Sequence, residues 1–255
     1  MSRRRRLLAA ALLAGLLAGP APARAYVLPA TSAVKKAAER RATLEVTAVE
    51  VTGALELHGA ARSRLGALTP AGDAPLAVAA RIAVKTAGRA RLELQPADLP
   101  DAQRPFAAVR DERLSGQGGL EATPAATVLV RALAALLAAP RGEEGKPLAE
   151  ALVRRGVKLD DATLGRFNGR LAYVVGGKSA DPGPLLYVDK ETFMPLRLQV
   201  VEGGTRLDVR LLDWASPIGG DWFPRAVEVW DGPSLLLRFT TEKAAANPKL
   251  PDAQF

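Results

Sequence analysis

The last third of the chain alternates apolar and polar residues with a period of two, which predicts a run of β-strands joined by short turns. Two strand–turn–strand units follow one another, over residues 185–200 and 206–230, and residues 235–239 continue the pattern. Strands that follow one another through short turns pair antiparallel. Because one set of alternate positions is apolar and the other polar, we expect a sheet with one solvated face and one face that must be covered.

The apolar face of this sheet is predicted to carry Leu196, Leu198, Val200, Leu207, Val209, Leu211, Val227, Val229, Leu235, Leu237 and Phe239. The polar face is predicted to carry Arg197, Gln199, Arg206, Asp208, Arg210, Glu228 and Arg238.

The strongest helical pattern lies over residues 124–155. Pro124 is well placed at a helix start, and the residues after it are apolar nearly all round, as in a buried helix. Residues 140–145 interrupt this helix, and a shorter one is predicted over 147–155. This helical insertion is the candidate cover for the apolar face of the sheet.

The first half of the chain has weaker patterns. We expect a helix over 31–41 whose cations, Arg41 among them, face water. Residues 44–58 predict two strands with a turn or bulge at Gly53, and 78–95 predict a hairpin. In 96–119 we expect loops and one short strand, residues 106–110. Helix, strands, helical insertion and strands together predict an α+β fold.

The N-terminus has the features of a secretory signal peptide. Arg3–Arg6 form a basic segment, residues 7–19 are apolar, and Ala23-Arg24-Ala25 has the small-x-small form of a cleavage site. The apolar stretch is shorter than the roughly 20 residues that span a bilayer. We therefore expect cleavage after residue 25, a mature single domain over 26–255, and a periplasmic location.

Charge and composition exclude several classes of function. The full chain has a net charge of +8, but residues 1–25 hold five arginines and no acid, so the mature chain is only mildly basic. Clustered cations with stacking aromatics, the signature of nucleic-acid binding, are missing from the sequence. The chain has no cysteine and one histidine, so we expect neither a disulfide nor a metal site, and no cofactor. We expect a monomer.

Three C-terminal motifs resemble the periplasmic lipoprotein-carrier superfamily, the LolA-like proteins that sort outer-membrane lipoproteins. The first is Tyr187-Val188-Asp189, Thr192 and Pro195-Leu196-Arg197-Leu198. The second is Asp213-Trp214 followed by Ile218-Gly219-Gly220 and Trp222-Phe223-Pro224. The third is the tail Asn247-Pro248, Leu250-Pro251-Asp252 and Phe255. The resemblance covers residues 185–255 and is only architectural before them.

The resemblance implies a curved antiparallel sheet, an incomplete barrel whose apolar concave face receives acyl chains beneath a helical lid. It therefore implies lipid or lipoprotein acyl chains as ligands, possible inner- or outer-membrane protein partners, and no catalysis. From the lid, the candidate cavity residues are Leu129, Leu133, Leu136 and Leu137. From the sheet they are Leu198, Val209, Val229 and Leu237, with Trp214 and Trp222 as candidates for the mouth.

Other interpretations are open from the residues alone. The helices could fill the sheet as an ordinary core, or the scaffold could be a sensor that binds a protein partner. Asp160 and Asp161 could form a paired-acid hydrolase site, although adjacent acids more often cap a helix or turn. His58 is expected to be a surface residue. The stretch 110–113 and Lys146 could attract anionic headgroups at the rim of the insertion, or simply be solvated.

If the signal peptide is cleaved as predicted, the protein recovered from the periplasm begins at Tyr26. The intact mass of the exported protein checks this prediction. A mass that retains residues 1–25 would contradict it.

Overall fold

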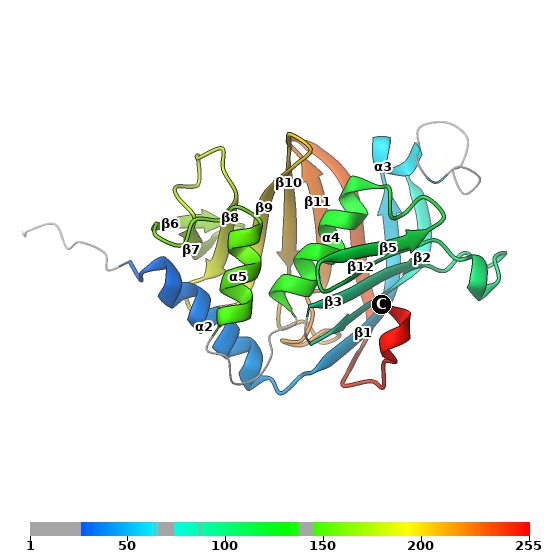
Figure 1. Cartoon of the computed structure of the whole chain (residues 1–255), viewed down its shortest axis with the longest axis horizontal. Helices are drawn as coiled ribbons and strands as arrows, with labels where there is room; N and C mark the ends of the chain where they lie inside the picture. The colour runs from blue at the N-terminus through cyan, green and yellow to red at the C-terminus, as the bar shows by residue number, and fades with distance from the viewer. Residues whose placement is uncertain (1–26, 64, 66–73, 87, 138–144) are drawn as a thin grey trace, which may run out of the picture.

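The computed structural model describes residues 27–63, 65, 74–86, 88–137 and 145–255 (Figure 1). Two antiparallel meanders carry the strands of this part of the chain. The first consists of β1 (Ala48–Leu57), β2 (Leu76–Lys85), β3 (Arg89–Leu94), β4 (Phe106–Arg110) and β5 (Arg113–Gln117). The second consists of β6 (Ala162–Phe167), β7 (Arg170–Val175), β8 (Leu185–Asp189), β9 (Pro195–Glu202), β10 (Thr205–Leu212), β11 (Ala226–Asp231) and β12 (Ser234–Ala246). The predicted signal peptide lies outside the described residues.

The two meanders join into one sheet through the pairing of β1 with β12. Across the described residues the sheet has twelve strands in the order β5-β4-β3-β2-β1-β12-β11-β10-β9-β8-β7-β6. The first strand of one meander and the last strand of the other therefore lie side by side in the middle. Strands β5 and β6 are the two edges and do not pair with each other, so the sheet is open.

Helices cover one face of this sheet, as Figure 1 shows for α4 (Pro124–Leu136) and α5 (Lys146–Arg154). The chain leaves the sheet at the β5 edge and re-enters it at the β6 edge, so the segment holding α4 and α5 must cross from one edge to the other. Helix α4 packs against strands of both meanders, β2–β4 and β9–β12. Helix α2 (Ala30–Thr43) packs against α5, β7 and β8. The short elements are α3 (Gly59–Ser63) and the 3-10 turns at Asp101–Gln103 and Asp252–Gln254.

The prediction of an α+β fold with a two-faced antiparallel sheet under a helical cover is confirmed. One large apolar cluster unites the inner face of the sheet with α4 and α2. On the outer face, Asp208 accepts ion-pair contacts from Arg197 at 2.6 Å and from Arg210 at 3.0 Å. A smaller apolar cluster lies apart from the main one and includes Tyr187 and Leu185.

Two residues predicted on the inner face do not lie there, because bulges shift the alternation. Tyr187 pairs with Arg197 and Val188 with Pro195, so Leu196 is the extra residue and packs in the smaller cluster. A second bulge pairs Leu235 with Trp230, and Leu236 packs against the main core instead.

The sequence also predicted too few strands at the edges and one too many at the centre. Residues 48–57 form one strand, with Gly53 at a register shift against β12, where two strands were expected. Strands β5 and β6 were not predicted. As edge strands they bury little, so their sequences lack the alternating apolar positions that mark the central strands.

Gly53 is required by the close approach of β12. A Cβ at this position would lie 1.9 Å from the carbonyl oxygen of Thr240, a backbone atom that cannot move alone. We expect Gly53→Ala to lower the free energy of unfolding by at least about 2 kcal/mol, the scale of overpacking a core. Equilibrium unfolding in urea, followed by circular dichroism, measures this change.

Gly183→Ala is the matched control, because a Cβ at residue 183 meets no atom within 4 Å. It should change the free energy of unfolding by no more than about 0.5 kcal/mol. Equal effects of the two substitutions would contradict the role given to Gly53.

Candidate functional site

The four sheet residues predicted to line a cavity form one continuous row. Val209 lies directly opposite Leu198 on one side and Val229 on the other, and Val229 lies opposite Leu237. The row continues to Leu186 of β8 at one end. Beyond Leu237 it reaches Leu57 of β1 and Leu76 of β2. Directly opposed residues share a face, so this row is an apolar strip that crosses both meanders.

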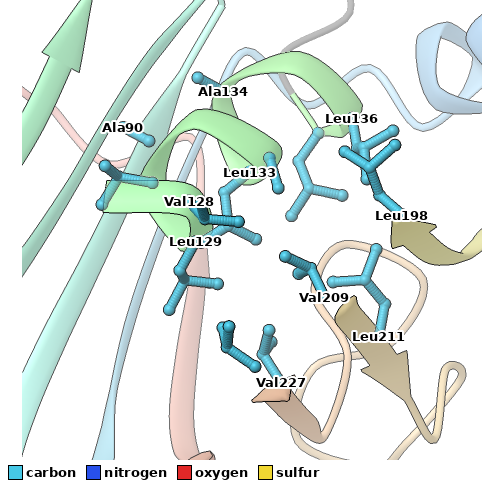
Figure 2. Close-up of a cluster of buried hydrophobic side chains, with 14 of the residues drawn as sticks. Ala90, Val128, Leu129, Leu133, Ala134, Leu136, Leu198, Val209, Leu211 and Val227 are labelled. Carbon is cyan, nitrogen blue, oxygen red and sulfur yellow. The ribbon is translucent and has the colours of Figure 1, made fainter. Parts of the chain in front are cut away.

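Helix α4 lies on this strip. Leu129, Leu133 and Leu136 follow one another at helical spacing, and Leu137 is the residue at the C-terminal cap. Figure 2 shows the α4 leucines and Leu198, Val209 and Val227 of the sheet converging from opposite sides. All eight predicted cavity residues belong to the main apolar cluster, and none is more than 4% exposed. In this conformation side chains occupy the contact between α4 and the sheet.

A cleft of about 370 Å³ opens beside this contact, between α4, α5 and β9. Its apolar wall consists of Val128, Ala132, Leu198, Val200 and Val201. Val128, Leu198 and Val200 are also members of the main apolar cluster, so the cleft leads directly to the core. Val201 is 49% exposed at its rim.

Charged side chains complete the lining of the cleft. Arg131, the only charged residue of α4, pairs with Glu202 at the end of β9. Arg155, just after α5, donates a hydrogen bond from each terminal nitrogen to Glu112, from Nη1 to Oε1 at 3.3 Å and from Nη2 to Oε2 at 3.1 Å. Arg154 also donates to Glu112, at 3.2 Å. The cleft thus combines an apolar wall with a rim of ion pairs.

Arg155 is the most enclosed of these charges. Its guanidinium also donates to the backbone carbonyls of Ala151 at 2.8 Å and Arg131 at 3.1 Å, which ties α5 to α4. Burial lowers the pKa of this guanidinium, and the Glu112 carboxylate opposes the shift.

Glu112 reaches these arginines from a strained turn. Asp111 and Glu112, between β4 and β5, have φ angles of +50° and +65°. Two successive left-handed residues make the tight turn that joins twisted strands, and glycine or asparagine usually occupies such positions. Backbone strain of this kind persists only where surrounding contacts stabilise it. Here those contacts are the ion pairs of Glu112 with Arg154 and Arg155.

Arg41 joins α2, α4 and the 213–223 loop at the other end of α4. It was predicted to face water, but it is only 4% exposed. Its guanidinium donates to the carbonyls of Asp221 at 2.8 Å, Trp222 at 3.0 Å and Leu137 at 3.3 Å. The contact with Leu137 satisfies a carbonyl that α4 leaves free at its C-terminus.

The helical spacing of α2 contains the signal that was missed. Arg41 follows the buried Val34 and Ala37 by seven and four residues, so it lies on the buried face of α2. Burial lowers its pKa to about 10, with the Asp221 carboxylate opposing the shift, so the group stays protonated at neutral pH.

The two candidate mouth tryptophans lie near Arg41 and do not line the cleft. Trp214 donates its indole N–H to the carbonyl of Pro195 at 2.8 Å. The guanidinium carbon of Arg41 lies over the Trp214 ring, 5.8 Å from the ring centre. Trp222 is 36% exposed. Both tryptophans therefore lie near the C-terminal end of α4, where Arg41 binds the carbonyls of Leu137 and Trp222.

The other candidates for chemistry stay apart. Within the part of the chain that the structure describes, no three His, Cys, Asp or Glu side chains form a group that could hold a metal ion. Asp160 and Asp161 are exposed ahead of β6. Nε2 of His58 lies 3.6 Å from Oε2 of Glu56. Arg110 and Arg113 line a separate cavity with Phe255, and Lys146 is an exposed partner of Glu150.

The cleft residues come from segments that the sequence did not connect. Glu112, Arg131, Arg154, Arg155 and Glu202 converge from the β4–β5 turn, the two helices and the end of β9. Two signals were present: Arg131 is a single cation in an otherwise apolar helix, and Glu112 belongs to the stretch 110–113 that was considered for the rim of the insertion.

No protein-family model matches this chain, and no curated protein matches it. Among solved structures it is similar to a LolA superfamily protein from Nitrosomonas europaea, with 14% identity and a TM-score of 0.49 over 90% of this chain and 98% of that one. A DUF1329 family protein from Desulfovibrio piger matches with 10% identity and a TM-score of 0.47, over 89% of this chain and 97% of that one.

A third similar structure is the complex of MucB with MucA(peri), with 16% identity and a TM-score of 0.27 over 88% of this chain and 58% of that one. At these identities and TM-scores, the likeness concerns the fold and carries no inference about function. The open sheet under helices, which the C-terminal motifs imply, is observed directly in this chain.

Replacing Arg41 should destabilise the fold, because three carbonyls lose their donor. We expect Arg41→Met to lower the free energy of unfolding by about 2–4 kcal/mol. Arg40→Met is the matched control: its pair with Asp221 is partly exposed, so a loss of no more than about 1 kcal/mol is expected. Urea unfolding of both variants measures the difference, and similar losses would contradict the role of Arg41.

Proposed function

We propose that the protein is an exported periplasmic carrier that binds lipid or lipoprotein acyl chains in the apolar layer between the sheet and α4. The observation that supports this proposal most is the continuity of the apolar surface. The cross-strand row under α4 passes through Leu198, and Leu198 also lines the cleft. An acyl chain in the cleft would therefore touch the same side chains that form the core.

Burial of apolar surface can supply the free energy of such binding without a set of precisely placed polar groups. Each buried methylene contributes about 0.8 kcal/mol, so a chain of about ten methylenes gains roughly 8 kcal/mol before the costs of association. Area and shape therefore decide affinity. Carrying an acyl chain requires no reaction, and in this proposal the protein is not an enzyme.

The cleft is the proposed mouth, and α4 is the proposed lid. Since the eight predicted cavity residues are already packed together, a chain longer than the cleft can enter the core only if α4 shifts from the sheet. Arg41 holds the C-terminal end of α4, whereas the cleft lies along its middle, at Val128 and Ala132. We therefore place the opening on the side of α4 that faces α5.

The proposed location follows from the N-terminal sequence. Its basic segment, apolar stretch and small-x-small site support export with cleavage. Within the described residues, no helix has the length and apolarity needed to cross a bilayer.

The cleft offers a test in which neither variant threatens the core. Val201→Lys introduces a charge at the rim of the cleft, where the valine is already half exposed. We expect it to weaken binding of a fluorescent fatty-acid ester about tenfold, the equivalent of losing burial of about one valine. Fluorescence titration of the mature protein measures the dissociation constant.

Val153→Lys is the matched control, because Val153 is 57% exposed on α5 and does not line the cleft. It should leave the dissociation constant unchanged. If the wild-type protein binds no acyl probe and carries no extractable lipid, the carrier proposal is wrong, and a protein-binding role for the scaffold takes its place.

A further inference from the structure

The charges of the cleft do not balance. Among the residues that the structure describes, its lining contains three guanidinium groups, on Arg131, Arg154 and Arg155, and two carboxylates, on Glu112 and Glu202. One positive charge therefore remains next to an apolar wall. A ligand with a negative charge is therefore attracted to the lining, whether or not Glu112 stays in place, whereas a neutral ligand leaves the positive charge uncompensated.

The arrangement around Glu112 shows what kind of anion fits. Each carboxylate oxygen of Glu112 accepts a hydrogen bond from a terminal nitrogen of Arg155, and Arg154 donates a third hydrogen bond. Paired guanidinium donors of this geometry recognise planar carboxylates and the oxygens of phosphate. Glu112 thus occupies a position in which an external carboxylate or phosphate could replace it.

Exchange of Glu112 for a ligand is favoured by the difference in exposure of the two partners. The Glu112 side chain is 42% exposed, and that of Arg155 is 10% exposed. Glu112 can move into water and stay hydrated, but Arg155 is held by the carbonyls of Ala151 and Arg131. A buried cation without a counter-ion is costly, so a departing Glu112 leaves a site that attracts an anion.

The size of the cleft limits the apolar part of the ligand. Pockets for small ligands range over about 300–1,000 Å³, and 370 Å³ lies near the lower end. That volume suits one chain lying against Val128, Leu198 and Val200.

We propose that the cleft selects single-chain lipids with an anionic head, a carboxylate or a phosphate, which docks among Arg131, Arg154 and Arg155 while the chain lies on the apolar wall. This inference rests on the proposed acyl-binding function and adds the chemical class of the ligand. The shared requirement is a negative charge at the end of one chain.

The direct test compares probes that differ only in charge. The mature protein is titrated at pH 8 and low salt with a fluorescent long-chain fatty acid and with its methyl ester. We expect the acid to bind at least tenfold more tightly, and its advantage to shrink as salt rises, because exposed charges are screened. Lysophosphatidic acid and monoacylglycerol form the second pair, which distinguishes a phosphate head from a carboxylate head.

A charge-matched pair of double variants locates the effect. Arg131→Gln with Arg154→Gln should weaken binding of the acid about tenfold and bring the ratio of acid to ester affinity close to one. Arg166→Gln with Lys178→Gln removes two exposed cations that do not line the cleft, and should change neither. Thermal unfolding of all variants checks that they are folded.

The outcomes separate this inference from the function on which it rests. Equal binding within both pairs, the acid with its ester and lysophosphatidic acid with monoacylglycerol, overturns the anionic head and leaves the carrier proposal standing. A preference for the acid that survives Arg131→Gln with Arg154→Gln also overturns it, because the charge would then be recognised elsewhere. Binding of neither probe overturns both.

Discussion

The pairing of β1 with β12 is the contact on which the rest of the structure depends. It joins two meanders that are otherwise separate in the chain, and it places β5 and β6 at opposite edges of one sheet. The chain between these edges must therefore cross a face of the sheet, and it does so as α4 and α5. Gly53 allows the pairing, because β12 approaches its Cα too closely for any side chain. The apolar layer and the cleft beside it both follow from this crossing.

The crossing also explains why one face of the sheet is apolar and covered, whereas the other is polar. The inner face carries an uninterrupted apolar row from β8 to β2, and a single 13-residue helix covers much of it. The outer face carries ion pairs such as those of Asp208. Helix α4 is anchored by Arg41 at its C-terminal end, while the gap between α4 and α5 stays open as a cleft with an excess of arginine. In the proposed carrier, the apolar layer would bind the acyl chain, α4 would act as its lid, and the charged rim of the cleft would select the head group.

Much of the sheet could be predicted from the sequence, because the alternation of apolar residues is a local signal. Leu198, Val209, Val229 and Leu237 were selected from four different strands, and the pairing places them in one row. The prediction was wrong at Leu196 and Leu235, since a bulge adds one residue and reverses the faces beyond it. The position of a bulge depends on the pairing with the neighbouring strand, so it cannot be read from the sequence of one strand alone.

The cleft could not be predicted for the same kind of reason. Glu112, Arg131, Arg155 and Glu202 are far apart in the chain, and only the crossing from β5 to β6 brings them together. Arg41 is different, because its position on the buried face of α2 follows from helical spacing. Its cationic head was interpreted as solvated, although the carbonyls that bind it belong to segments about 100 and 180 residues away in the sequence.

The central claim is that acyl chains bind on the concave side of the sheet, next to α4. A crystal structure of the mature protein with a fatty acid brominated at its terminal carbon tests this claim most directly, because anomalous scattering locates the bromine without ambiguity. The account predicts a bromine peak beside Leu198 and Val200 or deeper, between α4 and the row through Val209. A bromine peak on the outer face, or no peak in crystals grown with saturating lipid, would contradict it.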